Sequence, residues 1–94
     1  ILGLLLATGF SPAPAAQKPV KLGFTYIMSG PFATYGLFAK KGALMAVDEI
    51  NQAGGILGHP VEAYFEDSTG KPDVAKRAIR KLVYQQHVDC LIGL

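Results

Sequence analysis

The residue types that most often carry chemistry are few in this sequence. It has two histidines, His59 and His87, and one cysteine, Cys90, which together lack the spacing of a zinc site. His59 follows a glycine-rich turn and His87 ends a basic stretch, so we interpret both as surface residues rather than catalytic bases. Cys90 lies in an apolar run and is predicted to be a small buried hydrophobe, because reactive thiols need exposed, electropositive surroundings. We therefore predict no catalytic residue, no metal site and no cofactor.

One stretch has residues suited to holding a small molecule. Ser29–Gly36 (SGPFATYG) contains glycines, hydroxyl groups and a pair of aromatic rings. Backbone N–H groups at the start of a helix can hold an anion such as a carboxylate, and an aromatic ring can wall off the apolar part of a ligand. The same residues are also ordinary turn chemistry, so both interpretations stay open. No glycine stands between Gly30 and Gly36, and the dinucleotide-binding and P-loop patterns are both absent.

The elements that must position this loop read as alternating strands and helices. Val20–Met28 is almost continuously apolar, as expected for a strand buried on both faces. A helix is predicted from Tyr35 or Gly36 to Asn51, ended by a glycine-rich turn. Val61–Asp67 alternates and predicts a second strand near a sheet edge. The predicted buried stripe of the helix consists of Ala39, Ala43, Ala46, Val47 and Ile50.

A second helix is predicted from Asp73 to Gln86, followed by a third strand at Val88–Leu94. Its residues from Lys76 to Lys81 read as a solvated face. Strands separated by helices of this length predict an α/β fold with a doubly wound parallel sheet. In such sheets ligands bind beyond the carboxyl ends of the strands. Three segments are expected there: Ser29–Tyr35, Asp67–Lys71 and whatever follows Leu94.

The first sixteen residues differ in composition from the rest. No charged residue precedes Lys18, and residues 1–10 form an apolar run of signal-peptide length. That run is shorter than the roughly 20 residues that span a bilayer. Small residues and prolines follow, and Ala13 and Ala15 supply a small-x-small cleavage pattern. We predict that residues 1–16 are an N-terminally truncated signal peptide; the alternative is a buried strand or short core helix.

Overall charge and the position of the cysteine bear on location and partners. The chain has 94 residues, 50% of them hydrophobic, and a net charge of +2. This balance argues against nucleic-acid binding and against disorder. Because Cys90 is far from the predicted cleavage point, no lipid attachment is expected there. The predicted location is the periplasm, as an exported soluble protein.

In order and spacing, the motifs between Val20 and Gly93 resemble the substrate-binding proteins of ABC importers, in the branched-chain amino acid (Leu/Ile/Val) branch of the type I periplasmic binding proteins. The strand, Ser-Gly-Pro loop, helix end and Gly-Gly-Ile-Leu-Gly turn form one connected signature. The segments that carry it are Lys21–Phe24, Met28–Pro31, Tyr35–Gly36, Gly42, Ala46–Asn51, Ala53–Gly58, Glu66–Asp67, Pro72 and Val88–Gly93.

The resemblance implies two α/β lobes that close on a small solute, with residues 17–94 forming the first part of the N-terminal lobe. It implies an aromatic ligand-lining residue at Tyr35, with Ser29 and the Gly30–Pro31 turn shaping that wall. The implied partners are an amino acid or an analogue (an amide, urea or aromatic acid) and an ABC permease in the inner membrane. The main ligand-gripping residues would lie beyond Leu94 and in the second lobe.

One departure from the family concerns a disulfide. Some members link the loop after the second strand to the loop after the third, but here the first loop reads Ser68-Thr69-Gly70. This puts close kinship with the Leu/Ile/Val-specific proteins in doubt. Two other functions remain open: the extracellular sensing domain of a receptor, and an exported α/β enzyme with catalytic groups beyond Leu94.

Overall fold

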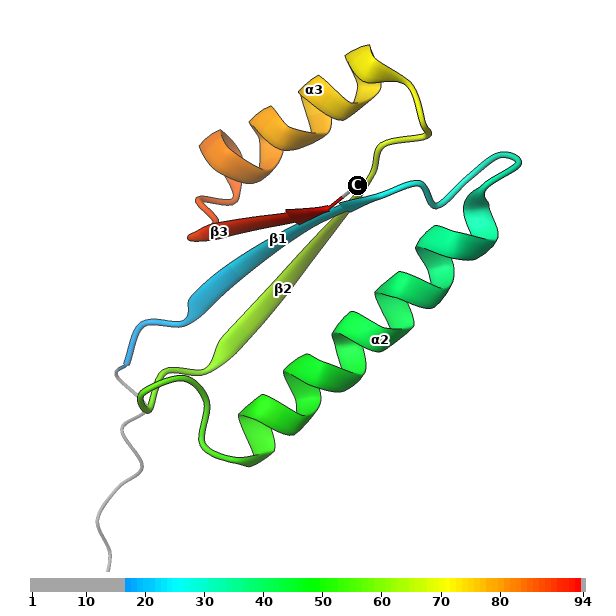
Figure 1. The fold of residues 1–94 in the computed structure, drawn as a ribbon. Helices are drawn as coiled ribbons and strands as arrows, with labels where there is room; N and C mark the ends of the chain where they lie inside the picture. The colour runs from blue at the N-terminus through cyan, green and yellow to red at the C-terminus, as the bar shows by residue number, and fades with distance from the viewer. Residues whose placement is uncertain (1–16, 94) are drawn as a thin grey trace, which may run out of the picture.

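The computed structural model describes residues 17–93 (Figure 1). Three strands alternate with helical segments, and the second helix runs on into a π-helical turn called η1. In chain order the elements are β1 (Val20–Tyr26), α2 (Ala33–Gln52), β2 (Val61–Asp67), α3 (Pro72–Arg80), η1 (Lys81–Gln85) and β3 (Cys90–Gly93).

The three strands form a parallel sheet in the order β2-β1-β3. Val20 of β1 is opposite Val61 of β2, and Leu22 is opposite Cys90 of β3, so β1 is the central strand. Figure 1 shows α2 on one face of the sheet and α3 with η1 on the other. This arrangement confirms the predicted α/β class with a doubly wound parallel sheet, and β2 lies at a sheet edge as expected.

The core has an aromatic side and an aliphatic side. Under α2, the rings of Phe24 and Phe65 stack with centroids 4.8 Å apart, and the ammonium of Lys40 lies 5.2 Å from the Phe65 ring centroid. On the opposite face, Leu82 is completely buried against Gly23. Burying these side chains on both faces of β1 explains why its sequence is almost continuously apolar.

Several predicted boundaries differ from those observed, and the local hydrogen bonds explain why. β1 ends at Tyr26 rather than Met28, because the Met28 N–H donates to the Asp67 side chain and not to a strand. α2 begins at Ala33, whose N–H donates to the Gly30 carbonyl at 3.1 Å, so the turn runs directly into the helix.

At the other end, the Val88 N–H donates to Leu82 at 3.1 Å, which ties Val88 to η1. β3 therefore begins at Cys90 rather than Val88. The helix predicted from Asp73 begins one residue earlier, at Pro72, a position where proline's missing N–H costs nothing.

Two burial predictions are wrong. Ala46 is exposed, because its direction falls at the margin of the stripe that α2 turns toward the sheet. Cys90 is also exposed, because it begins β3, an edge strand that pairs with β1 alone among the described strands.

The predicted signal peptide, residues 1–16, lies outside the described residues. Among residues 17–93, no helix has both the length and the apolar character required to cross a membrane.

Candidate functional site

Two loops meet at the carboxyl ends of β1 and β2. Loop 1 (residues 27–32) joins β1 to α2, and loop 2 (residues 68–71) joins β2 to α3. One carboxylate oxygen of Asp67, at the end of β2, accepts hydrogen bonds from the N–H groups of Met28 and Thr69, each at 2.8 Å. Asp67 therefore fastens the start of loop 1 to loop 2.

These hydrogen bonds also set the acidity of Asp67. The N–H of Met28 makes the largest contribution to holding the pKa of this carboxyl below its usual range, followed by the Ser29 side chain. The N–H of Thr69 adds to the effect, and partial desolvation opposes it. A carboxylate with this pKa stays ionised near neutral pH, so the junction between the loops is maintained there.

The first turn of α2 lies against the end of β1. Gly36 is buried, and a Cβ added to it would overlap the carbonyl oxygen of Ile27. Only glycine permits this close approach of a helix backbone to a strand end. The approach fixes the position of Tyr35, the neighbouring residue, beside loop 1.

An apolar hollow of about 210 Å³ opens between β1 and the start of α2. Tyr35 and Phe32 form its outer wall: their ring centroids are 6.5 Å apart, and they are 74% and 59% exposed. The lining contains no charged side chain, so it suits the apolar part of a ligand. The lining residues are Tyr26, Ile27, Phe32, Tyr35, Gly36 and Ala39.

A second hollow of about 220 Å³ lies on the α3 side of the same sheet edge. Ile27 contributes to both hollows, and loop 2 supplies Ser68, Gly70 and Lys71 to the second. The two hollows therefore flank the carboxyl end of β1, where ligands bind to open parallel sheets.

The predicted binding residues do not all meet at one place. Tyr35 lines the apolar hollow, whereas Ser29, Gly30 and Pro31 are exposed in loop 1 and lie outside its lining. Gly30 has a positive φ of 79°, so it shapes the turn that carries Phe32 to the hollow. Phe32 was assigned no role from the sequence, although the aromatic pair of this stretch was the signal that could have indicated it.

The other residues considered for chemistry lie elsewhere. The Nδ1 atom of His59 lies 2.6 Å from the Lys18 carbonyl oxygen, an interaction that joins the α2–β2 turn to the start of β1. His87 is exposed beyond η1, and Lys76 to Lys81 includes the exposed basic side chains expected of a solvated face. Within residues 17–93, no three side chains of the His, Cys, Asp or Glu types gather as metal ligands would.

Comparison with known families identifies the class of this fold. A family model described as periplasmic binding protein matches residues 19–94, which is most of the chain. The chain therefore belongs to the periplasmic binding protein family.

Relatives within this family have related names. The chain is 40% identical over 78 residues to the Leu/Ile/Val-binding protein BraC3 of Rhizobium johnstonii. The matched stretch covers 83% of this chain and 21% of that protein. It is 31% identical over 83 residues to the leucine-, isoleucine-, valine-, threonine- and alanine-binding protein of Pseudomonas aeruginosa, covering 88% of this chain and 22% of that protein. The chain thus spans about a fifth of the length of these relatives.

Solved structures agree on the fold. The branched-chain amino acid transporter substrate-binding protein LivJ of Streptococcus pneumoniae, in complex with isoleucine, matches with a TM-score of 0.78 and 40% identity. That match covers 82% of this chain and 22% of LivJ. A putative branched-chain amino acid ABC transporter protein from Silicibacter pomeroyi matches with a TM-score of 0.78 and 36% identity, covering 81% of this chain and 19% of that one.

Proposed function

We propose that this chain is the start of the N-terminal lobe of a substrate-binding component of an ABC importer. The protein binds an amino acid with an apolar side chain, or a related small solute, and delivers it unchanged to a membrane permease. Residues 1–16 direct its export, and the mature protein, from residue 17 onward, works in the periplasm.

The observation that carries this proposal is the apolar hollow at the carboxyl end of β1. Its walls include the rings of Phe32 and Tyr35 and no charged group, which suits an aliphatic side chain better than a sugar or an ion. The relatives are named as proteins that bind leucine, isoleucine and valine, and these names also support an amino acid with an apolar side chain as the ligand.

The polar end of the ligand has a complementary partner nearby. No side chain within the described residues caps the start of α2, a helix of 20 residues. The first N–H groups of such a helix and its dipole favour a carboxylate. The rim of the ligand site beside that helix end is then formed by the exposed residues Ser29, Gly30 and Pro31. Tyr35 covers the side chain of the ligand.

Calorimetry on the full-length mature protein tests the proposal. We expect saturable binding of leucine, isoleucine or valine, with acetamide, urea and benzoate as analogues that compete more weakly or not at all. The ligand recovered after incubation should be chemically unchanged. Conversion of the ligand to product would contradict the proposal and favour an exported enzyme.

Uptake in cells separates an importer from a sensor. Deleting the gene should abolish transport of the ligand identified by calorimetry, and the intact gene should restore it. Normal uptake in the deletion strain, together with the loss of a ligand-dependent transcriptional response, would contradict the transport role while leaving the binding site intact.

A further inference from the structure

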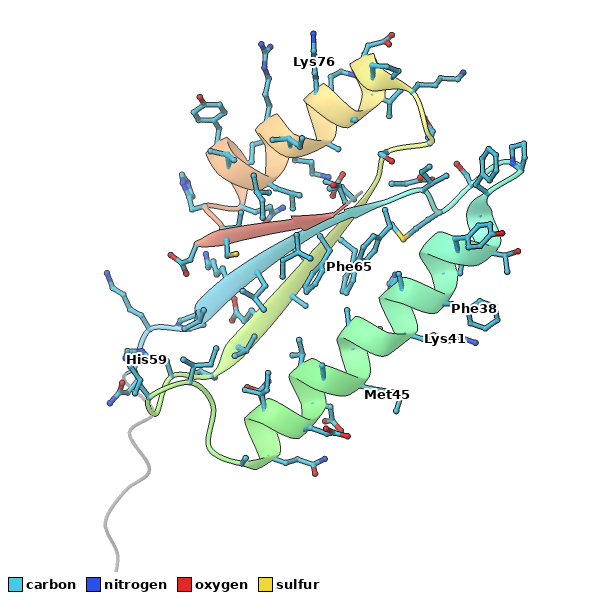
Figure 2. All side chains as sticks on the ribbon, in the orientation of Figure 1. Phe38, Lys41, Met45, His59, Phe65 and Lys76 are labelled. Atoms are coloured by element: carbon cyan, nitrogen blue, oxygen red, sulfur yellow. The ribbon has the colours of Figure 1, made fainter. Side chains whose placement is uncertain are left out.

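The face of α2 that points away from the sheet has a row of apolar side chains in water. Phe38 is 66% exposed and Met45 is 65% exposed, and the two lie two helical turns apart. Figure 2 shows both residues, with Lys41 between them, pointing away from the sheet, whereas Phe65 points from β2 toward α2. Exposed apolar rows of this kind mark interaction surfaces.

The layered fold keeps this face outward. α2 covers one face of the sheet (Figure 1). On its inner side the Lys40 ammonium lies over the ring of Phe65, which stacks on Phe24. Further helices of a doubly wound sheet lie beside α2 against additional strands, and not on top of it. The outer face of α2 is therefore still at the surface of the lobe when the sheet is extended.

The charges on this face are arranged in opposite halves of the helix. Phe38, Lys41, Met45 and Asp48 follow at alternating spacings of three and four, so they lie on one face of α2, with charged residues alternating with apolar ones. The Lys41 ammonium lies 5.9 Å from the ring centroid of Phe38. A small hollow of about 180 Å³ lies alongside, lined by Thr34, Leu37, Phe38 and Lys41.

We propose that this face binds a second copy of the protein, with the two α2 helices antiparallel about a two-fold axis. In this arrangement Met45 of each copy lies beside the hollow next to Lys41 of the other. Asp48 of each copy then lies opposite Phe38 of the other, where the ammonium of Lys41 is already placed. The contact is isologous, with two equivalent ion pairs.

The charges on the outer face of α2 favour an antiparallel second copy over a parallel copy or an anionic membrane. Parallel pairing would place Lys41 against Lys41 and Asp48 against Asp48, which is repulsive. An anionic membrane surface would be repelled by exposed Asp48 and Glu49 at one end of the row. Because a single pair of helices falls below about 1,200 Å² of buried surface, the dimer is expected to be weak and concentration-dependent.

Sedimentation velocity of the full-length mature protein over a concentration series tests this contact. The wild type should show a reversible monomer–dimer equilibrium, and Met45→Lys should be monomeric throughout. Lys41→Asp should raise the dimer dissociation constant at least about tenfold, because it faces Asp48 with a like charge. The double variant Lys41→Asp/Asp48→Lys should recover to within about threefold of the wild type.

A matched control is Lys76→Asp, which reverses an exposed lysine on α3, on the other side of the sheet (Figure 2). It should dimerise as the wild type does, and circular dichroism should show all variants folded. A wild type that stays monomeric, a Lys41→Asp variant no weaker than the control, or a double variant that fails to recover would each overturn the proposal. Binding of the monomer to anionic vesicles through this face would overturn it in favour of a membrane surface.

Discussion

Tyr35 and Phe32 lie side by side at the mouth of an apolar hollow, yet both are largely exposed in residues 17–93. Rings that are left in water at a hollow have most of their apolar area still to bury, so a ligand that covers them gains the corresponding free energy. The contribution of either ring is therefore expected to appear in binding rather than in folding.

Replacing Tyr35 by alanine should weaken ligand binding by about 1–3 kcal/mol in calorimetry on the full-length protein, since a buried aromatic wall is lost. The thermal midpoint without ligand should barely change. Tyr84→Ala is the matched control, because Tyr84 is 72% exposed against 74% for Tyr35 but lies on η1. Equal affinities for wild type and Tyr35→Ala would remove this residue from the site.

Asp67 has a different role, because its hydrogen bonds hold two loops together. Asp67→Asn keeps an acceptor oxygen but removes the charge that strengthens these bonds. The full-length variant should lose about 1 kcal/mol of unfolding free energy at neutral pH, a value kept small because the carboxylate is near solvent.

The pH dependence follows from the lowered pKa of Asp67. A carboxyl with a lower pKa in the folded state stabilises the protein above its unfolded pKa, and that contribution is lost as the pH falls through the folded value. The difference between wild type and Asp67→Asn in urea unfolding should therefore narrow in acid. Glu49→Gln, at an exposed position on α2, is the control. A difference that is constant from neutral to acid pH would contradict this role.

At the scale of elements, the placement of α2 depends on Gly36. Gly36→Ala would put a methyl group into the Ile27 carbonyl, so the helix must shift from the strand end. We expect a loss of about 2 kcal/mol or more in unfolding free energy, together with weaker ligand binding, because Tyr35 moves with the helix.

Gly42 provides a control on the same helix. A Cβ at Gly42 would meet nothing within 4 Å, so Gly42→Ala should stabilise the full-length protein by about 0.5–1 kcal/mol through helix propensity alone. Chemical unfolding measures both variants. Gly36→Ala with stability equal to Gly42→Ala would show that the close approach is dispensable.

The sequence was sufficient to predict the elements but not their ends. Periodicity predicted both strands that flank α2, because burial on one or both faces leaves a pattern in neighbouring residues. The end of β1 was predicted too late, because the Met28 N–H is used by Asp67, a residue distant in sequence. The π turn at Lys81–Gln85 was also missed. Its apolar residues continue the spacing of those in the preceding helix, so the sequence predicts one uninterrupted helix.

The candidate site was predicted only in part, for a related reason. Tyr35 was assigned through its motif, and it does line the hollow. The ring–ring arrangement with Phe32 and the joint between loops 1 and 2 depend on the packing of α2 on β1. Such tertiary contacts leave no local pattern, so Asp67 was predicted as the end of a strand and the start of a loop, without its role in joining loops 1 and 2.

At the scale of the whole molecule, the described residues, 17–93, bury few of their apolar side chains. The hydrophobic side chains that are buried in the described residues are Phe24, Tyr26, Val61, Ala78 and Leu82. On β3, Leu91 and Ile92 are 44% and 40% exposed, although their sequence is that of an interior strand. This core is too small to offset the conformational entropy of ordering the chain.

A polypeptide of residues 17–94 alone should therefore lack cooperative unfolding and near-ultraviolet circular dichroism, whereas the full-length mature protein should show both. Adding residues that continue the sheet beyond β3 should restore the transition. A sigmoidal two-state urea curve for residues 17–94 alone would contradict this expectation.

The central position of β1 has a consequence for the order in which the sheet can form. Among the described strands β1 leaves the ribosome first. Its partner β2 follows after one helix, α2, and its other partner β3 follows only after a second helical segment, α3 with η1. Until then the backbone N–H and C=O groups along one or both edges of β1 lack a strand partner. The sheet can therefore be completed only once β3, at the far end of the described residues, has been synthesised.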